Sequence, residues 1–478
     1  MSGLEFKRMG ELGAFYWGCF SITAALCVLL QIIARQQEKA QLEKKEATAT
    51  NTRFAAFQRN YIMIYLLAMF SDWLQGPYVY QLYVSYGFDQ QAIAELFVCG
   101  FGSSMIVGTF VGGIADKFGR KNACILYSIT YILACFTKTV PEYWTLMLGR
   151  FLSGVSTSLL FSVFESWMVC EHQKQGFDSA LLGGTFSNAI FGNGLVAVGA
   201  GFVANAAASS YGYIAPFVVA ILPLTAVAFL VATTWAENYG NQSANMLSSL
   251  RQGLELIQND SRICALGLAQ SCFEGSMYTF VFMWTPALKT DEEEAAEAAG
   301  IELDESTSDH LGMIFAIFMV CVMIGSSLFK IATQSGVDFY KIPLYIHGMA
   351  FLNFLLVSLF IENKSVVLTM FLCFEGTVGV FYPSYGVIKS EKIPEDIRAS
   401  VMNIFRIPLN FFVVILLLKV KFLSPTTVFT ICTIAQGVAL ACYYFFYSTL
   451  KSVNIANNVS REDKMSDLDQ LLEKDETV

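Results

Sequence analysis

Residues 112–121 read GGIADKFGRK, a short polar stretch between two long apolar runs. The runs cover about residues 92–115 and 122–140, close to the roughly 20 residues that a helix needs to cross a bilayer. Gly112 and Gly119 allow close helix approach and a tight turn. Asp116 can accept hydrogen bonds or pair with a basic side chain in one conformation and lose these contacts in another. The stretch therefore predicts a turn between two membrane helices that works as a gate latch.

Apolar runs of similar length extend in both directions from this stretch. A bilayer offers no water to backbone amides, so we predict helices rather than strands. We expect thirteen transmembrane segments, at about 13–34, 61–84, 92–115, 122–140, 143–168, 180–207, 212–234, 263–288, 310–333, 341–361, 365–388, 397–422 and 425–447.

The composition agrees with a membrane protein. Of the 478 residues 55% are hydrophobic and 14% are charged, against roughly 25% charged residues in soluble domains. The sequence has no basic stripe, so we do not expect a nucleic-acid partner. The twelve cysteines show no zinc-ligand spacing, and three histidines are too few for a histidine metal cluster, so we predict no metal and no cofactor. The sequence contains no nucleophile–base pair that would indicate an enzyme.

The order of the segments predicts two halves. Lysine and arginine collect on one side if residues 35–60 are cytosolic, which places the C-terminus in the cytosol and the acidic stretch 291–309 outside. The domains are then an anchor helix with a cytosolic linker (1–60), a six-helix half (61–234), a cytosolic linker (235–262), a second six-helix half (263–447) and an acidic tail (448–478). We interpret the first segment as a retained anchor rather than a signal peptide, because no small-residue cleavage site precedes Arg35.

The latch sequence resembles a known signature. Gly112, Asp116, Lys117, Gly119, Arg120 and Lys121 match G-x-x-x-D-[RK]-x-G-[RK]-[RK], which the major facilitator superfamily carries between its second and third helices. Residues 149–158, GRFLSGVSTS, resemble a second pattern of that superfamily, with an arginine in the fourth helix. The resemblance implies an all-α major facilitator fold with one extra N-terminal helix and a substrate site at the midplane between the halves.

Charges inside the predicted spans are costly and mark candidate functional residues. Asp72 and Glu274 lie at equivalent depths in the first helix of each half, and Glu375 and Arg406 lie near mid-depth in consecutive helices. We predict that Glu375 and Arg406 form an ion pair. We assign these four residues to the cavity, and place Arg150 further out.

The chain also resembles the molybdate-anion transporter family. The resemblance is carried by SDWLQGPYVYQLY (71–83), DKFGRKNACILYSITYILACFTK (116–138), GRFLSGVSTSLLFSVFESW (149–167), FVFMWTPAL (280–288), GSSLFKIAT (325–333), FEGTVGVFYPS (374–384) and NIFRIP (403–408). It implies uptake of molybdate, a tetrahedral dianion. Two alternatives stay open: a facilitator for another organic anion or a sugar, and a transporter-like sensor that does not transport.

The charge balance leads to a coupling hypothesis. Arg406, Arg150 and Asn403 are the predicted substrate-binding residues, and a planar guanidinium suits an oxyanion. Two arginines cannot neutralise three carboxylates and also hold a dianion. Burial disfavours a charged carboxylate, so we expect Asp72, Glu274 or Glu375 to carry a proton when the anion binds.

The C-terminal tail suggests a location. Asp467, Leu471 and Leu472 form an acidic dileucine pattern, which predicts a sorting adaptor as a partner. We expect a monomer in the plasma membrane, with an endolysosomal membrane as the alternative.

Overall fold

The computed structural model describes residues 3–44, 49–240, 246–288, 305–419 and 422–475, and every regular element in these ranges is a helix. The α-helices are α1 (Gly3–Lys44), α2 (Ala49–Gln75), α3 (Val79–Ser85), α4 (Gln90–Phe118), α5 (Arg120–Thr137), α6 (Tyr143–Leu160), α7 (Val163–Lys174), α8 (Leu182–Tyr211), α9 (Ala215–Thr234), α10 (Met246–Asn259), α11 (Ser261–Leu288), α13 (Glu305–Gln334), α14 (Ile342–Leu359), α15 (Lys364–Lys392), α16 (Arg398–Lys419) and α17 (Pro425–Asp475). Short 3₁₀ turns occupy Gly76–Tyr78, Ser179–Leu181 and Glu395–Ile397.

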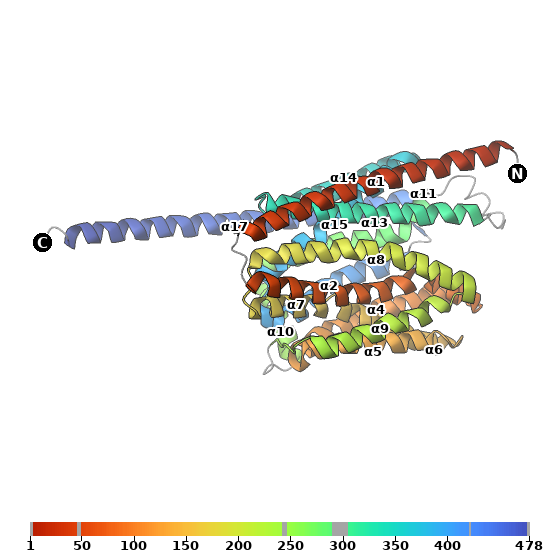
Figure 1. Ribbon diagram of the computed structural model, residues 1–478, viewed down its shortest axis with the longest axis horizontal. Coiled ribbons are helices and arrows are strands. Elements are labelled where there is room, and N and C mark those ends of the chain that lie inside the picture. Colours follow the sequence, from red (N-terminus) through yellow and green to blue (C-terminus); the bar gives the residue numbers. More distant parts are fainter. Residues whose placement is uncertain (1–2, 45–48, 241–245, 289–304, 420–421, 476–478) are drawn as a thin grey trace.

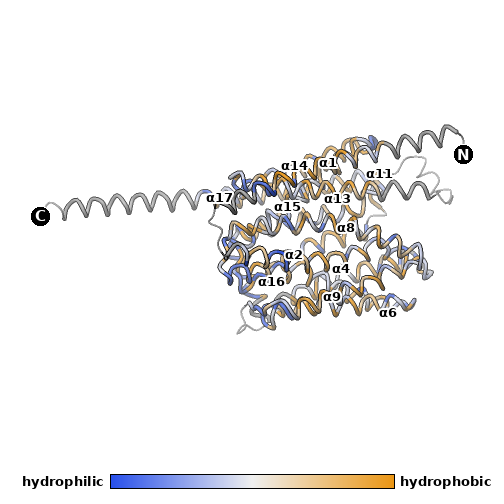
Figure 2. Tube along the Cα trace, in the orientation of Figure 1, coloured by the Kyte–Doolittle hydropathy of each residue, from blue (hydrophilic) through white to orange (hydrophobic). Residues whose placement is uncertain are grey.

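Ten helical stretches among the described residues are long and apolar enough to cross a membrane. The predicted spans at 61–84, 122–140 and 263–288 also form helices, namely α2 with α3, α5 and α11, but their mean hydropathy keeps them out of these ten. Figure 2 shows hydrophobic residues along the middle of the bundle and hydrophilic residues gathered at the end that carries α10. The chain is therefore a multi-pass membrane protein.

The bundle is built from two halves, α2–α9 and α11–α17, which lie side by side (Figure 1). Two long contacts join them. α4 packs against α16, and α8 packs against α13 and α15. Because both contacts run along helices, side chains that face them from the two halves can share one site.

The extra N-terminal helix packs on the second half. α1 lies along α13 at one edge of the bundle (Figure 1), and Ser327 of α13 donates a hydrogen bond to Oε1 of Gln31 at 3.0 Å. Large apolar side chains of α1 between residues 15 and 37 are exposed, as expected for a helix that faces lipid.

Two of the predicted membrane segments are interrupted by short breaks in the helix. The Gly76-Pro77 step ends α2 in a 3₁₀ turn, since proline lacks the amide proton that a continuing helix needs. The segment predicted at 143–168 is broken at Phe161 and Ser162, so that α6 and α7 are separate helices. The predicted linker 235–262 contains α10, which contacts α4 of one half and α16 of the other.

Candidate functional site

The latch residues at the end of α4 form a buried ion pair. Asp116 is fully buried, and its Oδ1 accepts hydrogen bonds from Nε of Arg120 at 3.1 Å and from Nη2 at 3.0 Å. Arg120 is also fully buried and begins α5, one residue after the turn. A buried charge of either sign is costly without a partner, so each residue stabilises the other.

This pair also joins the two halves. Arg120 donates through Nη2 to the carbonyl of Glu395 in the second half, and its Nη1 lies 4.0 Å from the Glu395 carboxylate. Ser400 of α16 donates to Oδ2 of Asp116 at 3.2 Å. We call Asp116, Arg120, Glu395 and Ser400 the latch. In this structure the latch is closed, and it holds the N-terminus of α16 against the turn after α4.

Glu237, just after α9, completes the turn and was missed from the sequence. Its carboxylate accepts the backbone amides of Lys121 at 2.8 Å and Asn122 at 3.2 Å, which are free donors in the first turn of α5. A Cβ added to Gly119, whose φ is 108°, would collide with this carboxylate. Gly119 therefore meets two needs at once, the positive φ and the space for Glu237.

The remaining signature residues lie around the turn. Gly112 is in α4, and Nζ of Lys117 lies 5.5 Å from the ring centroid of Phe118. Nζ of Lys121 donates to the carbonyl of Ala232 at 2.8 Å. Lys117 and Lys121 thus lie at the edge of the latch, not in its buried core.

Arg406 occupies the contact between the halves. Its side chain is on α16, only 7% exposed, and its guanidinium carbon lies 5.0 Å from the ring centroid of Phe161, where α6 ends. The Nε of Arg406 has no hydrogen-bond partner, and the side chain makes no ion pair within the described ranges. A buried cation is costly unless a negative charge or hydrogen-bond acceptors compensate it.

The carboxyl group near Arg406 is that of Glu274. Glu274 of α11 lies within electrostatic range of Arg406 and Lys389, and Nε2 of Gln270 donates to it at 2.9 Å. Asp72 of α2 faces the same region from the first half, and accepts the Tyr131 hydroxyl at 2.6 Å. Asp72 and Glu274 therefore both lie near the surroundings of Arg406.

The predicted ion pair between Glu375 and Arg406 is wrong in this structure. Glu375 is buried in α15 near Cys321 of α13, and makes no hydrogen bond or ion pair with a described residue. The prediction used depth along each helix, but the two side chains leave their helices in different directions. Glu375 points into the second half, whereas Arg406 points toward the first.

Lys389 is a second buried cation near Glu274, which the sequence did not reveal. Its Nζ lies 3.3 Å from Oε1 of Glu165 in α7, so the ion pair crosses between the halves. The predicted span stopped at 388, whereas α15 continues to Lys392 and buries this lysine. Lys389, like Arg406, lies within electrostatic range of the Glu274 carboxyl group.

Arg150 and Asn403 have different surroundings. Arg150 donates from Nε to the carbonyl of Leu96 at 3.3 Å and stacks on Phe97 at 4.5 Å, so it binds α6 to α4 within the first half. Asn403 is buried one turn before Arg406, and its Oδ1 has no hydrogen-bond partner. The structure therefore brings Asn403 together with Arg406, and leaves Arg150 apart from them.

Two sequence features lie outside the described residues. The acidic stretch 291–309 falls mostly in 289–304, and the side chains of Asp467, Leu471 and Leu472 are likewise not described. Within the described ranges, no group of three His, Cys, Asp or Glu residues could hold a metal ion.

Sequence comparison identifies related transporters. Residues 15–381 match the model of a family described as "Sugar-transporters, 12 TM". The molybdate-anion transporter of Takifugu rubripes is 33% identical over an alignment of 430 residues, which covers 83% of this chain and 85% of that protein. The molybdate-anion transporter of Xenopus tropicalis is 33% identical over 418 residues, covering 84% and 88% of the two chains.

Solved structures share the fold. A bacterial homologue of the iron transporter ferroportin, in an outward-facing state, matches with a TM-score of 0.65, 15% identity, and 82% of this chain against 99% of its own. The Escherichia coli fucose:proton symporter matches with a TM-score of 0.62, 15% identity, and 82% and 98% of the two chains. These similarities establish the architecture. Together with the family match they show that the protein is a transporter and not an enzyme, and that the chain belongs to the molybdate-anion transporter family of the major facilitator superfamily.

Proposed function

We propose that this chain is a secondary active transporter of a small oxyanion, with molybdate as the first candidate. The observation that carries the proposal is the state of Arg406, a buried guanidinium between the halves with no ion pair to a described carboxylate. An uncharged sugar would bring no negative charge to this cation, whereas a tetrahedral dianion can accept two parallel N–H bonds from it. The names of the relatives supply molybdate as the anion to test first.

The latch supports an alternating-access cycle. It closes one end of the bundle by contacts between the halves, and Lys389 with Glu165 adds a second contact nearer to Arg406. An anion bound at Arg406 competes with Glu165 for the charge of Lys389. Binding therefore weakens one of the contacts that hold the halves together, and the halves can then separate at the latch end, which we place in the cytosol.

Proton coupling follows from the charge balance. Asp72 and Glu274 both face the interface that holds Arg406 and Lys389. Bringing a dianion beside two ionised carboxylates is costly, and one proton on either acid removes most of that repulsion. We propose that protons accompany the anion, so uptake rises as the outside pH falls.

Uptake of radiolabelled molybdate into liposomes that contain the purified protein tests the proposal. We expect Arg406→Gln to lower kcat/KM about tenfold or more, and Arg406→Lys to retain part of the activity. Arg251→Gln is the matched control, because the Arg251 side chain is 79% exposed on α10. Sulfate should compete with molybdate, and an uncharged hexose should not.

Four results would count against the proposal. Wild-type uptake by Arg406→Gln would remove the anion site from this residue. Competition by a hexose instead of sulfate would favour a sugar carrier. Stoichiometric binding of molybdate without any uptake would favour a sensor. If the uptake rate does not depend on pH in the wild type, in Asp72→Asn and in Glu274→Gln, transport is not coupled to protons.

A further inference from the structure

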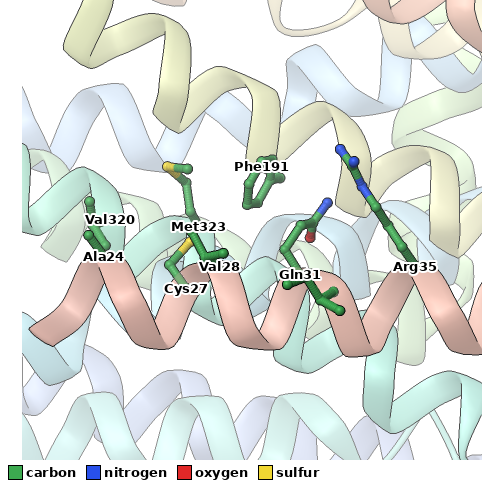
Figure 3. Close-up of a pocket in the computed structure, with 9 residues that line it drawn as sticks. Ala24, Cys27, Val28, Gln31, Arg35, Phe191, Val320 and Met323 are labelled. Atoms are coloured by element: carbon green, nitrogen blue, oxygen red, sulfur yellow. The ribbon is translucent and has the colours of Figure 1, made fainter.

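The extra helix α1 does not close completely against the bundle. A cavity of about 260 Å³ remains between α1, α8 and α13 (Figure 3). The residues of α1 that line the cavity lie along one face of the helix: Ala24, Cys27, Val28, Gln31, Ile32 and Arg35. Phe191 of α8 and Val320 and Met323 of α13 form the opposite walls.

The cavity is apolar along most of its length and polar at one end. Gln31 and Arg35 are its polar lining residues, and both lie toward the end of α1 that leads to α2. Gln31 is already engaged by the hydroxyl of Ser327 at 3.0 Å. Arg35 makes no hydrogen bond or ion pair with a described residue, and in Figure 3 its side chain extends to the same side of α1 as Gln31. Among the described residues, the cavity therefore offers one cation that has no hydrogen-bonded or ionic partner.

The position of Arg35 matches the edge of the membrane. The apolar stretch of α1 runs from Phe15 to Gln37, so Arg35 is two residues from its end. Val28 is 60% exposed and Ile32 is 49% exposed, so the cavity opens sideways to the surroundings of the bundle. A molecule that fits must enter from the lipid, with an apolar chain along α1 and a negative group at the membrane surface.

We infer that this groove binds one anionic phospholipid, with an acyl chain between α1, α8 and α13 and its phosphate at Arg35. Charge complementarity selects this occupant. A zwitterionic lipid would fill the apolar part equally well and its phosphate can also reach the guanidinium, but its own cationic group offsets that attraction. A headgroup with net negative charge therefore binds more tightly. Arginine near a membrane surface attracts anionic lipids for the same reason. The site is independent of Arg406 and of the transported substrate.

Native mass spectrometry of the purified full-length protein, equilibrated with dioleoyl phosphatidylserine or dioleoyl phosphatidylcholine, tests the site. We expect a retained phosphatidylserine adduct on the wild type, and about fivefold weaker retention on Arg35→Gln. Arg59→Gln is the control for charge, because Arg59 is an exposed arginine at the same end of the bundle outside the groove. Arg35→Lys should keep most of the preference.

A second pair of variants tests the apolar part. Ala24→Phe places a ring in the groove and should remove both lipids. Leu26 lies outside the groove and is 45% exposed, so Leu26→Phe should remove neither lipid. Equal retention of phosphatidylserine by Arg35→Gln and the wild type would overturn the inference, as would equal retention of the two lipids by the wild type. Monodisperse elution of each variant in size-exclusion chromatography shows that it is folded.

Discussion

Nζ of Lys389 in the second half lies 3.3 Å from Oε1 of Glu165 in the first. The lysine side chain is 7% exposed and the glutamate side chain 22%, so water screens this pair much less than a surface pair. Lys389 precedes the latch residues Glu395 and Ser400 in sequence, and it shares with Arg406 an electrostatic interaction with Glu274. In the proposed cycle this pair connects the Arg406 site to the interface that opens.

Removing one partner of this pair should cost more than removing both. Lys389→Met alone and Glu165→Gln alone should each lower the free energy of unfolding by roughly 2 kcal/mol, because each variant alters a largely buried charge pair. The double variant should recover much of this loss. Thermal unfolding in detergent measures the cycle, with Arg251 and Glu255 as the exposed control pair that should couple by no more than about 0.5 kcal/mol. Simple additivity at Lys389 and Glu165 would show that the pair does not hold the halves.

Gly119→Ala should open the latch end. The substitution places a Cβ against the Glu237 carboxylate and imposes a φ of 108° on a residue with a side chain. We expect a loss of uptake together with roughly 2 kcal/mol or more of stability. Gly87→Ala is the matched control, since Gly87 has a φ of 84° and open space around it, so it carries only the backbone cost of about 1–2 kcal/mol. If the two variants behave alike, the Glu237 contact contributes nothing.

Arg406 should couple to Glu274 and not to Glu375. Glu274 lies within electrostatic range of Arg406, whereas Glu375 lies near Cys321 in the interior of the second half. A double-mutant cycle of Arg406→Gln with Glu375→Gln should be additive within about 0.5 kcal/mol, and the cycle with Glu274→Gln should deviate by about 1 kcal/mol or more. A large coupling to Glu375 would mean that the halves rearrange to bring these residues together.

Asp260 should make the start of α11 sensitive to acid. Its Oδ1 accepts the amide of Arg262 at 2.9 Å, and the hydrogen bond from the Arg262 side chain holds the pKa of Asp260 below its ordinary value. A lowered folded-state pKa means that this stabilisation is complete above the ordinary aspartate pKa, near about 4, and is lost as the pH falls through the lowered value. Asp260→Ala should cost about 1 kcal/mol at pH 7 through loss of the cap. The difference from the wild type should shrink at about pH 3 in thermal unfolding, and a constant difference would contradict this account.

The membrane helices and the latch signature could be predicted from the sequence because their signals are local. Apolar runs of fixed length reveal a helix wherever it packs, and Asp116 and Arg120 lie only four residues apart. The partners of the latch could not be predicted in this way. Ser400 is 284 residues from Asp116, and Glu237 is 116 residues from Lys121, so only the folded chain brings them together.

The central site shows the same limit more sharply. Depth along a helix marked Asp72, Glu274 and Arg406 as candidates, and these three residues interact with the same surroundings in the structure. It failed for Glu375, because depth does not specify the direction in which a side chain leaves its helix. It also failed for Lys389, which lies close to a helix end where a lysine normally reaches water, yet is buried by its contact with Glu165.

The packing of α1 on α13 places the first helix of the chain on the second half of the bundle. α1 precedes the first half in sequence but packs on the second, so in the proposed cycle an opening of the latch would change the distance between α1 and the helices of the first half. A pair of spectroscopic labels on α1 and on α9 would therefore read the transport cycle as a single distance. A label pair on α1 and α14 would stay constant, and would serve as an internal ruler for the same molecule.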